Sequence, residues 1–296
     1  MVDILLASYN GEKYIAQQID SILSQTYSNW MLYINDDCSS DDTVKIIERY
    51  SKQYPDKIIY TVNDKNSGNA GTNFFNMIKK SKADIIMTCD QDDVWLNDKV
   101  ENCVNALKGE NEPTLVHTDL KLIDADNNII NDSMMKLQHI NPHRNSTNKL
   151  IVQNTVTGCT MAFNRALADI IKIPKGQPVH DWYIAVVASL FGKIKFIDKA
   201  DILYRQHSDN YCGAVDMENM DYISNRFKDK NKAKYMIELG YDMAEEIIRL
   251  YNIDNKMLNS YSSMKNYSKL KKLYIVFRYG IWKSGIIRKL GQIYFM

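Results

Sequence analysis

The feature that most restricts the fold of this chain is an alternation of apolar and amphipathic segments over its first 120 residues. Short apolar runs typical of strands occupy residues 2–7, 30–34, 58–62, 85–88 and 115–118. Between them lie segments with helical spacing, the first carried by Ile15, Ile19 and Ile22 and the later ones at 43–54 and from 72 onward. Such alternation predicts an α/β fold, with a largely parallel sheet and helices on both faces. Ligands of these sheets bind at the carboxyl ends of the strands.

The pattern loosens after Asp119. Residues 124–150 are rich in Asn and Asp, and order returns at 156–163, at a helix near 180–190, and at two short strands, 194–197 and 202–204. From residue 217 the sequence is typical of helices. We therefore expect one domain over residues 1–215 and a helical extension over 216–296.

Composition excludes several classes of protein. The 296 residues are 45% hydrophobic and 25% charged, which is typical of a folded globular protein. The five cysteines are scattered without a CxxC pair, so we expect neither a zinc site nor disulfides, and a cytoplasmic location. We expect no secretion signal and no transmembrane helix, because there is no signal-like start and no run of 18 apolar residues.

Carboxylates collect directly after the predicted strands. The second strand is followed by Asp36 and Asp37, and the fourth by Asp90, Asp92 and Asp93. Carboxylates gathered at one edge repel each other unless a cation lies among them, and Mg²⁺ prefers such ligands together with phosphate oxygens. The alternative is that each Asp caps a helix. Five together favour a site for a metal-bound phosphate ligand.

Common nucleotide-binding fingerprints are absent. No GxGxxG follows the first strand, and GxxxxGK[ST] does not occur. A dinucleotide-dependent dehydrogenase and a P-loop enzyme are therefore disfavoured.

Three motifs in order resemble those of family 2 glycosyltransferases. They are Ala7-Ser8-Tyr9-Asn10-Gly11, Asp36-Asp37-Cys38-Ser39-Ser40-Asp41 and Asp90-Gln91-Asp92-Asp93. The resemblance covers residues 2–210 and is nearest to the bacterial rhamnosyltransferase-like branch. It implies the GT-A fold, a Rossmann-like, mostly parallel central sheet flanked by helices, here with a helical C-terminal extension. The nucleotide-binding half would span about 1–120 and the acceptor half about 121–215. Cys38 stands where many members have Gly, which affects a turn more than the chemistry.

The resemblance also implies roles for individual residues. Asp181, in His180-Asp181-Trp182, would be the catalytic base, and Asp92 and His207 would hold the metal. The nucleotide would contact Ser8, Tyr9, Asn10, Glu12, Asp36, Asp37, Asn66, Gly68, Asn73 and Asp90. The donor-sugar and acceptor pocket would include Gln91, Asp93, Trp95, Gly158, Cys159, Thr160, His180, Trp182 and Arg205.

Four of these residues have simpler interpretations. Asp181 precedes an apolar helical segment and could be an N-cap. His207 could be an ordinary surface histidine, Trp182 could belong to the core, and Gly158 could serve a positive φ angle.

The implied reaction is inverting transfer of a sugar, rhamnose from dTDP-rhamnose or a hexose from a UDP-sugar, assisted by Mn²⁺ or Mg²⁺. The acceptor would be a hydroxyl of a lipid-linked or cell-surface saccharide in bacterial capsule or cell-wall polysaccharide synthesis. Two alternatives stay open at this point. A sugar-phosphate nucleotidyltransferase would need a Gly-rich basic loop, which Asn10-Gly11-Glu12-Lys13 matches poorly, and a non-catalytic saccharide-binding protein would not require Asp90, Asp92 and Asp181.

Charge is distributed unevenly along the chain. Residues 265–296 contain eight Lys/Arg and no Asp/Glu, so with a net charge of +1 the rest of the chain carries 1 − 8 = −7. Aromatic and aliphatic residues alternate with these cations, a pattern suited to an anionic membrane surface. We expect peripheral attachment to the inner face of the bacterial membrane, with a packed helix or a homodimer contact as alternatives. Nucleic acid is disfavoured because the rest of the chain is acidic.

Overall fold

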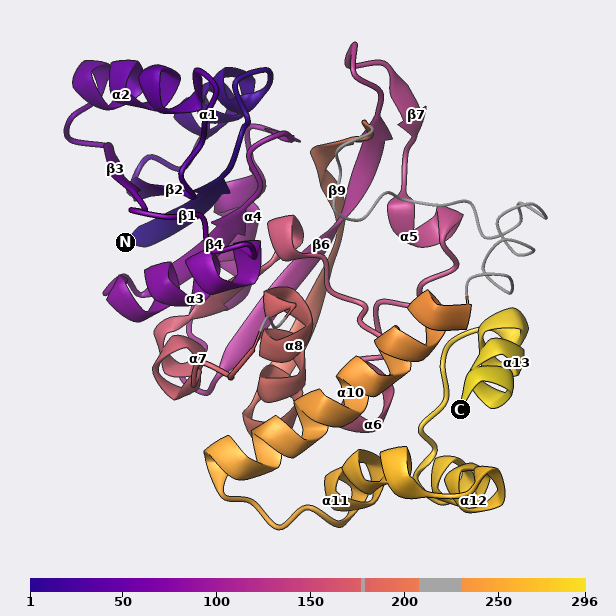
Figure 1. The fold of residues 1–296 in the computed structure, drawn as a ribbon. Helices are drawn as coiled ribbons and strands as arrows, with labels where there is room; N and C mark the ends of the chain where they lie inside the picture. The colour runs from indigo at the N-terminus through magenta and orange to yellow at the C-terminus, as the bar shows by residue number, and fades with distance from the viewer. Residues whose placement is uncertain (177–178, 208–229) are drawn as a thin grey trace.

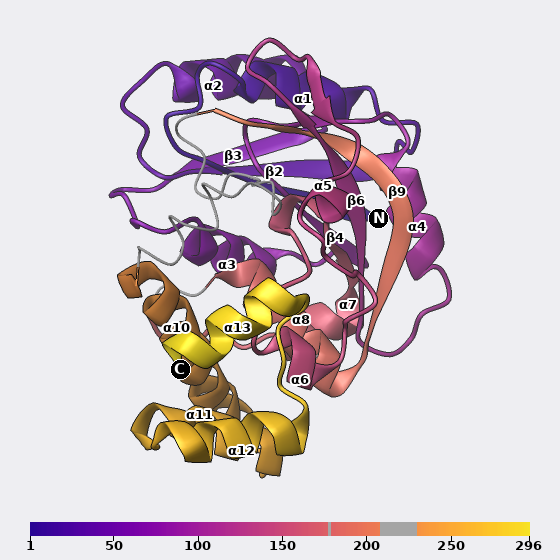
Figure 2. The same cartoon turned by 90° about the vertical axis from the view of Figure 1, so that its right-hand side faces the viewer.

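The computed structural model describes residues 1–176, 179–207 and 230–296. Within these ranges, nine strands form one curled sheet with helices on both faces (Figure 1). The predicted α/β fold is therefore confirmed. Turning the molecule shows the last helices gathered at the end opposite the first two (Figure 2).

The first half of the sheet is parallel, in the order β3-β2-β1-β4. Its strands are β1 (Val2–Ser8), β2 (Trp30–Asp36), β3 (Ile58–Val62) and β4 (Ile85–Cys89). Ser8 at the end of β1 pairs with Asp36 of β2, and Leu6 pairs with Cys89 of β4. The polar residues that follow these strands therefore meet at one edge of the sheet.

Helices connect these strands and cover them. They are α1 (Ile15–Leu23), α2 (Thr43–Gln53), α3 (Ala70–Lys80) and α4 (Lys99–Leu107). Ile15, Ile19 and Ile22 are fully buried, as their spacing predicted. Alternate residues of β1 enter two different cores: Ile4 packs on the α1 side, whereas Leu5 packs on the α3 side.

The second half of the sheet is mixed. It comprises β5 (Val94–Trp95), β6 (Thr114–Ile123), β7 (Ile129–Asn131), β8 (Ala162–Asn164) and β9 (Lys193–Arg205). β8 runs antiparallel to β4 and β6, and β9 runs parallel to β6. The expectation of two short strands at 194–197 and 202–204 is wrong, because β9 is continuous. Its register against β6 shifts between Thr118 and Asp119, which lets one strand pass the polar residues at 198–199.

Helical segments, most of them short, lie between and after these strands. They are α5 (Met134–Leu137), α6 (Thr147–Leu150), the 3₁₀ turn η1 (Gly158–Thr160), α7 (Arg165–Ile170) and α8 (His180–Phe191). α8 is apolar on nearly all sides and is buried from Trp182 to Ala188. Its N-terminus brings Asp181 to the edge where the parallel strands end.

The C-terminal extension is helical, as expected. It consists of α10 (Lys230–Tyr251), α11 (Lys256–Ser262), the 3₁₀ turn η2 (Ser263–Asn266), α12 (Lys269–Tyr279) and α13 (Ile286–Phe295). Ile237, Tyr241 and Ala244 of α10 share one core with α8, so the extension is packed on α8. The expected boundary between residues 215 and 216 lies outside the described residues. In the described part of the chain, no helix is long and apolar enough to span a bilayer.

Candidate active site

The ends of β1, β2 and β4 open into a cavity of about 350 Å³, here called the rim cavity. It is bounded by Ala7, Ser8, Tyr9, Asp37, Asn66, Gly68, Asn69, Ala70, Asn73, Asp90, Gln91, Asp92 and Tyr204. Most of the residues expected to contact a nucleotide are in this set, because parallel strands deliver their C-terminal loops to one edge.

The paired carboxylates after β2 have different surroundings. Asp36 is fully buried and accepts hydrogen bonds from the hydroxyls of Ser8 (2.8 Å) and Ser39 (2.6 Å). Asp37 lines the rim cavity and accepts bonds from Asn63 (2.7 Å) and from the Ser67 hydroxyl (2.8 Å). Although burial opposes the effect, these donors lower the pKa of Asp37. Asp37 is therefore placed to meet a ligand, whereas Asp36 stabilises the loop.

Asn10 and Glu12 also stabilise loops and do not border the cavity. Asn10 has a positive φ of 47°, and its side chain accepts a bond from the backbone of Ser40 at 2.9 Å. Glu12 accepts one from the backbone of Asp42 at 2.8 Å. Both residues therefore join the first loop to the second, and their contact with a nucleotide stays a prediction.

Three residues that the sequence reasoning missed take part in this region. Asn63 donates to Asp37 and, at 2.9 Å, to Asn73, so it holds two walls of the cavity together. Ser67 also holds Asp37, and Tyr204 closes the far side. The Asn-Ser-Gly-Asn loop signalled Ser67, but nothing local signalled Asn63, which acts across the sheet.

Gln91 connects the loops after β1 and β4. Its amide donates to the carbonyl of Tyr9 and accepts from the Tyr9 N–H, both at 2.9 Å. Gly11 lies against the same amide, and a Cβ atom there would be 2.2 Å from its oxygen. A side chain at position 11 would therefore displace the Gln91 amide from Tyr9.

Carboxylates crowd the floor of the rim cavity. Burial, followed by the charges of Asp92 and Asp181, raises the pKa of Asp90 to about 7. Asp93 is fully buried, and burial together with the Asp92 and Asp90 charges raises its pKa well above the usual range. Raised carboxyl pKa values of this kind mark a site with an excess of negative charge, which a cation would balance.

Two groups of side chains offer metal ligands. His207 Nε2 lies 2.9 Å from Asp92 Oδ2, so the two residues expected to bind metal are adjacent. Ligand atoms of Asp90, Asp93 and Cys159 also lie within 4.8 Å of one another. Asp93 and Cys159 are buried, and burial raises the pKa of the Cys159 thiol well above its usual range, which disfavours the thiolate. The hard-ion ligand set that fits best is therefore Asp92 with His207, next to Asp90.

Asp181 has the environment of a proton acceptor. Burial raises its pKa to about 6, although the backbone N–H groups of Trp182 and Gly158 bond to it and act in the opposite direction. The Trp182 N–H lies 2.6 Å from Asp181 Oδ1. The helix begins after Val179, which is the N-cap residue, so Asp181 is not the cap.

Gly158 and His180 are placed by close packing. A Cβ at Gly158 would be 3.0 Å from His180 Nε2, and Gly158 has no positive φ, so the interpretation from backbone angle is wrong. The His180 ring stacks on Phe74, with the ring centroids 4.2 Å apart, and burial lowers its pKa to about 3. Thr160 is buried and bonds to the carbonyl of Thr157 at 2.7 Å.

Several expected pocket residues instead form the core behind the cavity. Trp95 is 1% exposed, Cys159 is buried, and Trp182 is 3% exposed with its indole N–H donated to Leu150 at 2.6 Å. Neither tryptophan presents a face to a sugar. Arg205 is fully buried, donates to the carbonyl of Asp92 at 2.9 Å and holds the loop after β4 in place. These four residues were expected to line the pocket, and that assignment is corrected. Their side chains are buried beneath the loop and support it from below.

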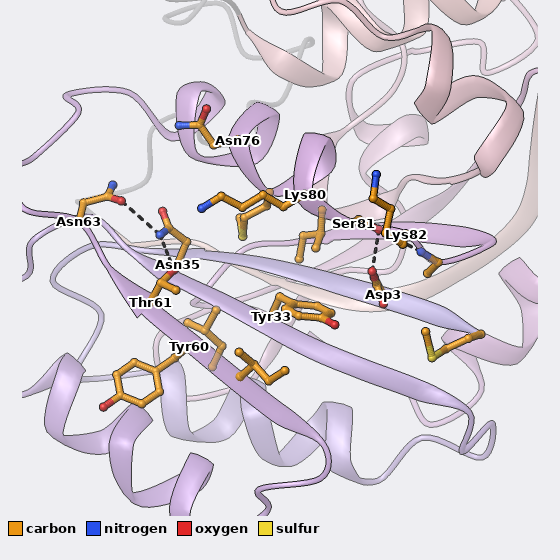
Figure 3. Close-up of a pocket in the computed structure, with 16 residues that line it drawn as sticks. Asp3, Tyr33, Asn35, Tyr60, Thr61, Asn63, Asn76, Lys80, Ser81 and Lys82 are labelled. Carbon is orange, nitrogen blue, oxygen red and sulfur yellow. Dashed lines mark hydrogen bonds between the residues drawn. The ribbon is translucent and has the colours of Figure 1, made fainter.

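A second cavity of about 210 Å³ lies under α3 and shares no lining residue with the rim cavity (Figure 3). Its lining includes Asp3, Tyr33, Asn35, Asn63 and Lys80. Asn63, which lines this second cavity, donates to Asp37 of the rim cavity at 2.7 Å, so a hydrogen bond connects the two walls. The carboxylates of Asp37, Asp90 and Asp92 line the rim cavity, which makes it the candidate active site.

Comparisons with known proteins agree with this geometry. The chain is 28% identical over 222 residues to a dTDP-rhamnosyl transferase of Shigella flexneri, covering 71% of this chain and 74% of the relative. It is 27% identical over 258 residues to an Escherichia coli UDP-Glc:alpha-D-GlcNAc-diphosphoundecaprenol beta-1,3-glucosyltransferase, covering 86% and 91%.

The fold is also that of solved glycosyltransferases. A mannosyltransferase from Pyrobaculum calidifontis, solved with GDP-Man and Mn²⁺, superposes with a TM-score of 0.56 at 16% identity, covering 99% of this chain and 78% of that one. The GT-A fold expected from the motifs is confirmed. The sequence profile described as Glycosyl transferase family 2 matches residues 3–171, more than half of the chain. The chain therefore belongs to glycosyltransferase family 2.

Proposed function

We propose that this chain is a metal-dependent, inverting glycosyltransferase that moves a sugar from a nucleotide diphosphate to a saccharide hydroxyl. The observation that supports this most is the closeness of Asp90, Asp92 and Asp181. Asp90 and Asp92 line the rim cavity, burial and then the charges of Asp92 and Asp181 raise the pKa of Asp90 to about 7, and burial raises that of Asp181 to about 6. Mutual repulsion of carboxylates costs folding free energy, so their conjunction favours a role in catalysis.

Asp181 is the proposed base. The acceptor hydroxyl must lose a proton as its oxygen bonds to the anomeric carbon, and a carboxylate with a pKa of about 6 is ionised at neutral pH yet basic enough to accept it. Attack opposite the leaving diphosphate in a single displacement inverts the anomeric centre. The backbone N–H groups of Trp182 and Gly158 and the side chain of Asn154 hydrogen-bond to this carboxylate and hold it in place.

Asp92 and His207 are proposed to hold the divalent cation, with Asp90 toward the ribose or sugar. Such a cation, when bound, stabilises the charge that develops on the departing diphosphate. The Mn²⁺ in the solved mannosyltransferase supports a divalent cation. Mn²⁺ and Mg²⁺ accept the same oxygen ligands.

The proposed donor is dTDP-rhamnose or a UDP-hexose, supported by the donors that the two bacterial relatives are named for. The proposed acceptor is a lipid-linked or cell-surface saccharide of bacterial polysaccharide synthesis, used on the cytoplasmic side of the membrane. The diphosphoundecaprenol acceptor in the glucosyltransferase's name supports the lipid-linked form.

Thermal shift and donor hydrolysis test the proposal with dTDP-rhamnose, UDP-glucose, UDP-galactose, UDP-GlcNAc and GDP-mannose, each with and without Mn²⁺ or Mg²⁺. Metal-dependent stabilisation by one donor, with slow release of its nucleoside diphosphate, is the expected result. A folded protein that binds no nucleotide by isothermal titration would contradict the proposal and favour a non-catalytic saccharide-binding protein.

A further inference from the structure

Two C-terminal helices expose an unusual amount of apolar surface. Of the 17 large apolar side chains that are exposed in the described ranges, seven lie on α12 and α13. They are Leu270 (81%), Tyr274 (61%), Phe277 (70%), Ile286 (77%), Ile287 (40%), Leu290 (57%) and Tyr294 (53%), here called the C-terminal face. Exposed apolar side chains concentrated on two helices are uncommon in a protein that has no partner for them.

The spacing of these residues gives each helix one apolar side. Leu270, Tyr274 and Phe277 follow the i, i+4, i+7 pattern on α12, and Ile286, Leu290 and Tyr294 follow i, i+4, i+8 on α13. Both views place α12 and α13 in the same region of the molecule, away from α1 and α2, with α13 beside α10 and α12 beside α11 (Figures 1 and 2).

The cations of this region lie beside the apolar residues. Lys269, Lys271, Arg278 and Lys289 are exposed, and residues 265–296 contain no Asp or Glu. Amphipathic helices whose only charged residues are cations have the composition of helices that lie in the interface of an anionic bilayer. It is poorly suited to a second copy of the same face, since a two-fold contact would bring like charges together.

The opposite sides of these helices are firmly packed on the domain. Ile275, Val276 and Ile281 are buried in the core that includes α8. The side chain of Asn148 donates to Tyr279 at 2.8 Å, and the backbone N–H of Ser284 donates to Gln153 at 2.7 Å. The exposed residues are therefore the outward side of docked helices.

The segment that holds these helices also holds the proposed base. The carbonyl of Leu150, two residues after Asn148, accepts the Trp182 indole N–H. The side chain of Asn154 is hydrogen-bonded to Asp181. A few residues thus connect the C-terminal face to the start of α8. Any surface that the face binds would lie at a set distance and angle from Asp181.

We propose that the C-terminal face docks on an anionic lipid bilayer as a rigid platform, which orients the active site toward an acceptor carried in that bilayer. The inference rests on the proposed function for the acceptor, but docking itself is a property of the surface. Leu270, Phe277, Ile286 and Leu290 enter the interface, and the flanking cations meet lipid phosphates. The partner is the bilayer.

Flotation with vesicles tests the proposal on the full chain. One set of vesicles contains phosphatidylcholine alone and the other adds phosphatidylglycerol. The test variant is L270E/F277E/I286E. The matched control, I129E/I130E, changes two residues of β7 that are 56% and 55% exposed but stand apart from this face. A second variant, K269Q/K271Q/R278Q, removes charge without altering the apolar side.

Wild type and control should float with anionic vesicles, and the triple Glu variant should lose more than about tenfold in partition coefficient, since inserted apolar side chains become charged. The Gln variant should bind more weakly and lose most of its salt dependence. Equal flotation of wild type and the triple Glu variant would overturn the proposal. So would a dimer in solution that the Glu variant dissociates, with no binding to vesicles.

Donor hydrolysis without vesicles separates this proposal from the proposed function. The triple Glu variant should hydrolyse the soluble donor as fast as wild type, because its changes are outside the rim cavity. Loss of flotation with hydrolysis retained supports docking. If the wild type floats with vesicles but hydrolyses no donor, the result supports docking and counts against the proposed transfer of a sugar.

Discussion

Replacement of Asp181 by Asn should stabilise the metal-free protein at neutral pH while abolishing most of its activity. The pKa of Asp181 rises from 3.8 to about 6 because the carboxyl is buried. Between these two values the folded protein binds more protons than the unfolded chain, so the wild type loses stability as pH rises from about 4 through about 6. Asn is neutral throughout and avoids that loss.

The size of the effect follows from the pKa difference. At about 1.4 kcal/mol for each pKa unit, the rise corresponds to about 3 kcal/mol. That figure is an upper limit, because the side chain keeps some contact with water, which screens the charge. We expect a gain in the free energy of unfolding of roughly 1–3 kcal/mol at pH 8 and almost none at pH 4. Loss of the Asp181 charge also lowers the pKa of Asp90, an effect of the same sign.

Urea unfolding in EDTA at pH 4, 6 and 8 measures the effect without a bound cation. The exposed residue Asp56 provides the control, since D56N should leave the difference from wild type unchanged across this range. If D181N differs from wild type by the same free energy at pH 4 and pH 8, the reasoning fails, because Asp181 would then have an ordinary pKa.

The remaining predictions concern the same site. D181N should lower kcat by roughly 10²–10⁴-fold in stopped assays, while titration with donor should show that donor binding is retained. The kcat/KM of the wild type should fall below about pH 6, as the base is protonated. Near-normal turnover by D181N would show that Asp181 is not the base. D92N should abolish Mn²⁺-dependent stabilisation by donor in thermal shift, and an unchanged shift would place the metal elsewhere. G158A should cost about 1–3 kcal/mol in unfolding free energy, because its Cβ meets His180 at 3.0 Å; a stability equal to wild type would mean that the ring moves freely. R205Q should cost roughly 1–3 kcal/mol, since it removes a buried guanidinium that donates to the Asp92 carbonyl at 2.9 Å and to Gln17 at 2.8 Å, and an unchanged stability in urea unfolding would show that these bonds contribute little.

Local patterns predicted the sheet and its edge well. Ile15, Ile19 and Ile22 are buried as their period requires, and Asp37, Asp90 and Asp92 all border one cavity. These predictions succeeded because periodicity and strand ends are properties of neighbouring residues, and parallel strands bring their ends to a common edge.

Side-chain direction was predicted less well. Trp95 and Trp182 are aromatic residues beside the motifs, yet both belong to the core. Asn10 and Glu12 lie in the first motif, yet bond to the following loop. The chain neighbours of a residue in a loop do not decide which way it points; the segments packed around it do.

The amino-acid sequence by itself determined the α/β class, the rim of carboxylates and the basic, apolar C-terminal segment, since each depends on residue type and spacing along the chain. Only the tertiary structure decided that Asp181 lies near Asp90, that Asn63 holds Asp37, and that α12 and α13 are docked with their apolar sides outward. These are contacts between distant segments, and their formation depends on how the whole core packs, a property that no single stretch of sequence carries.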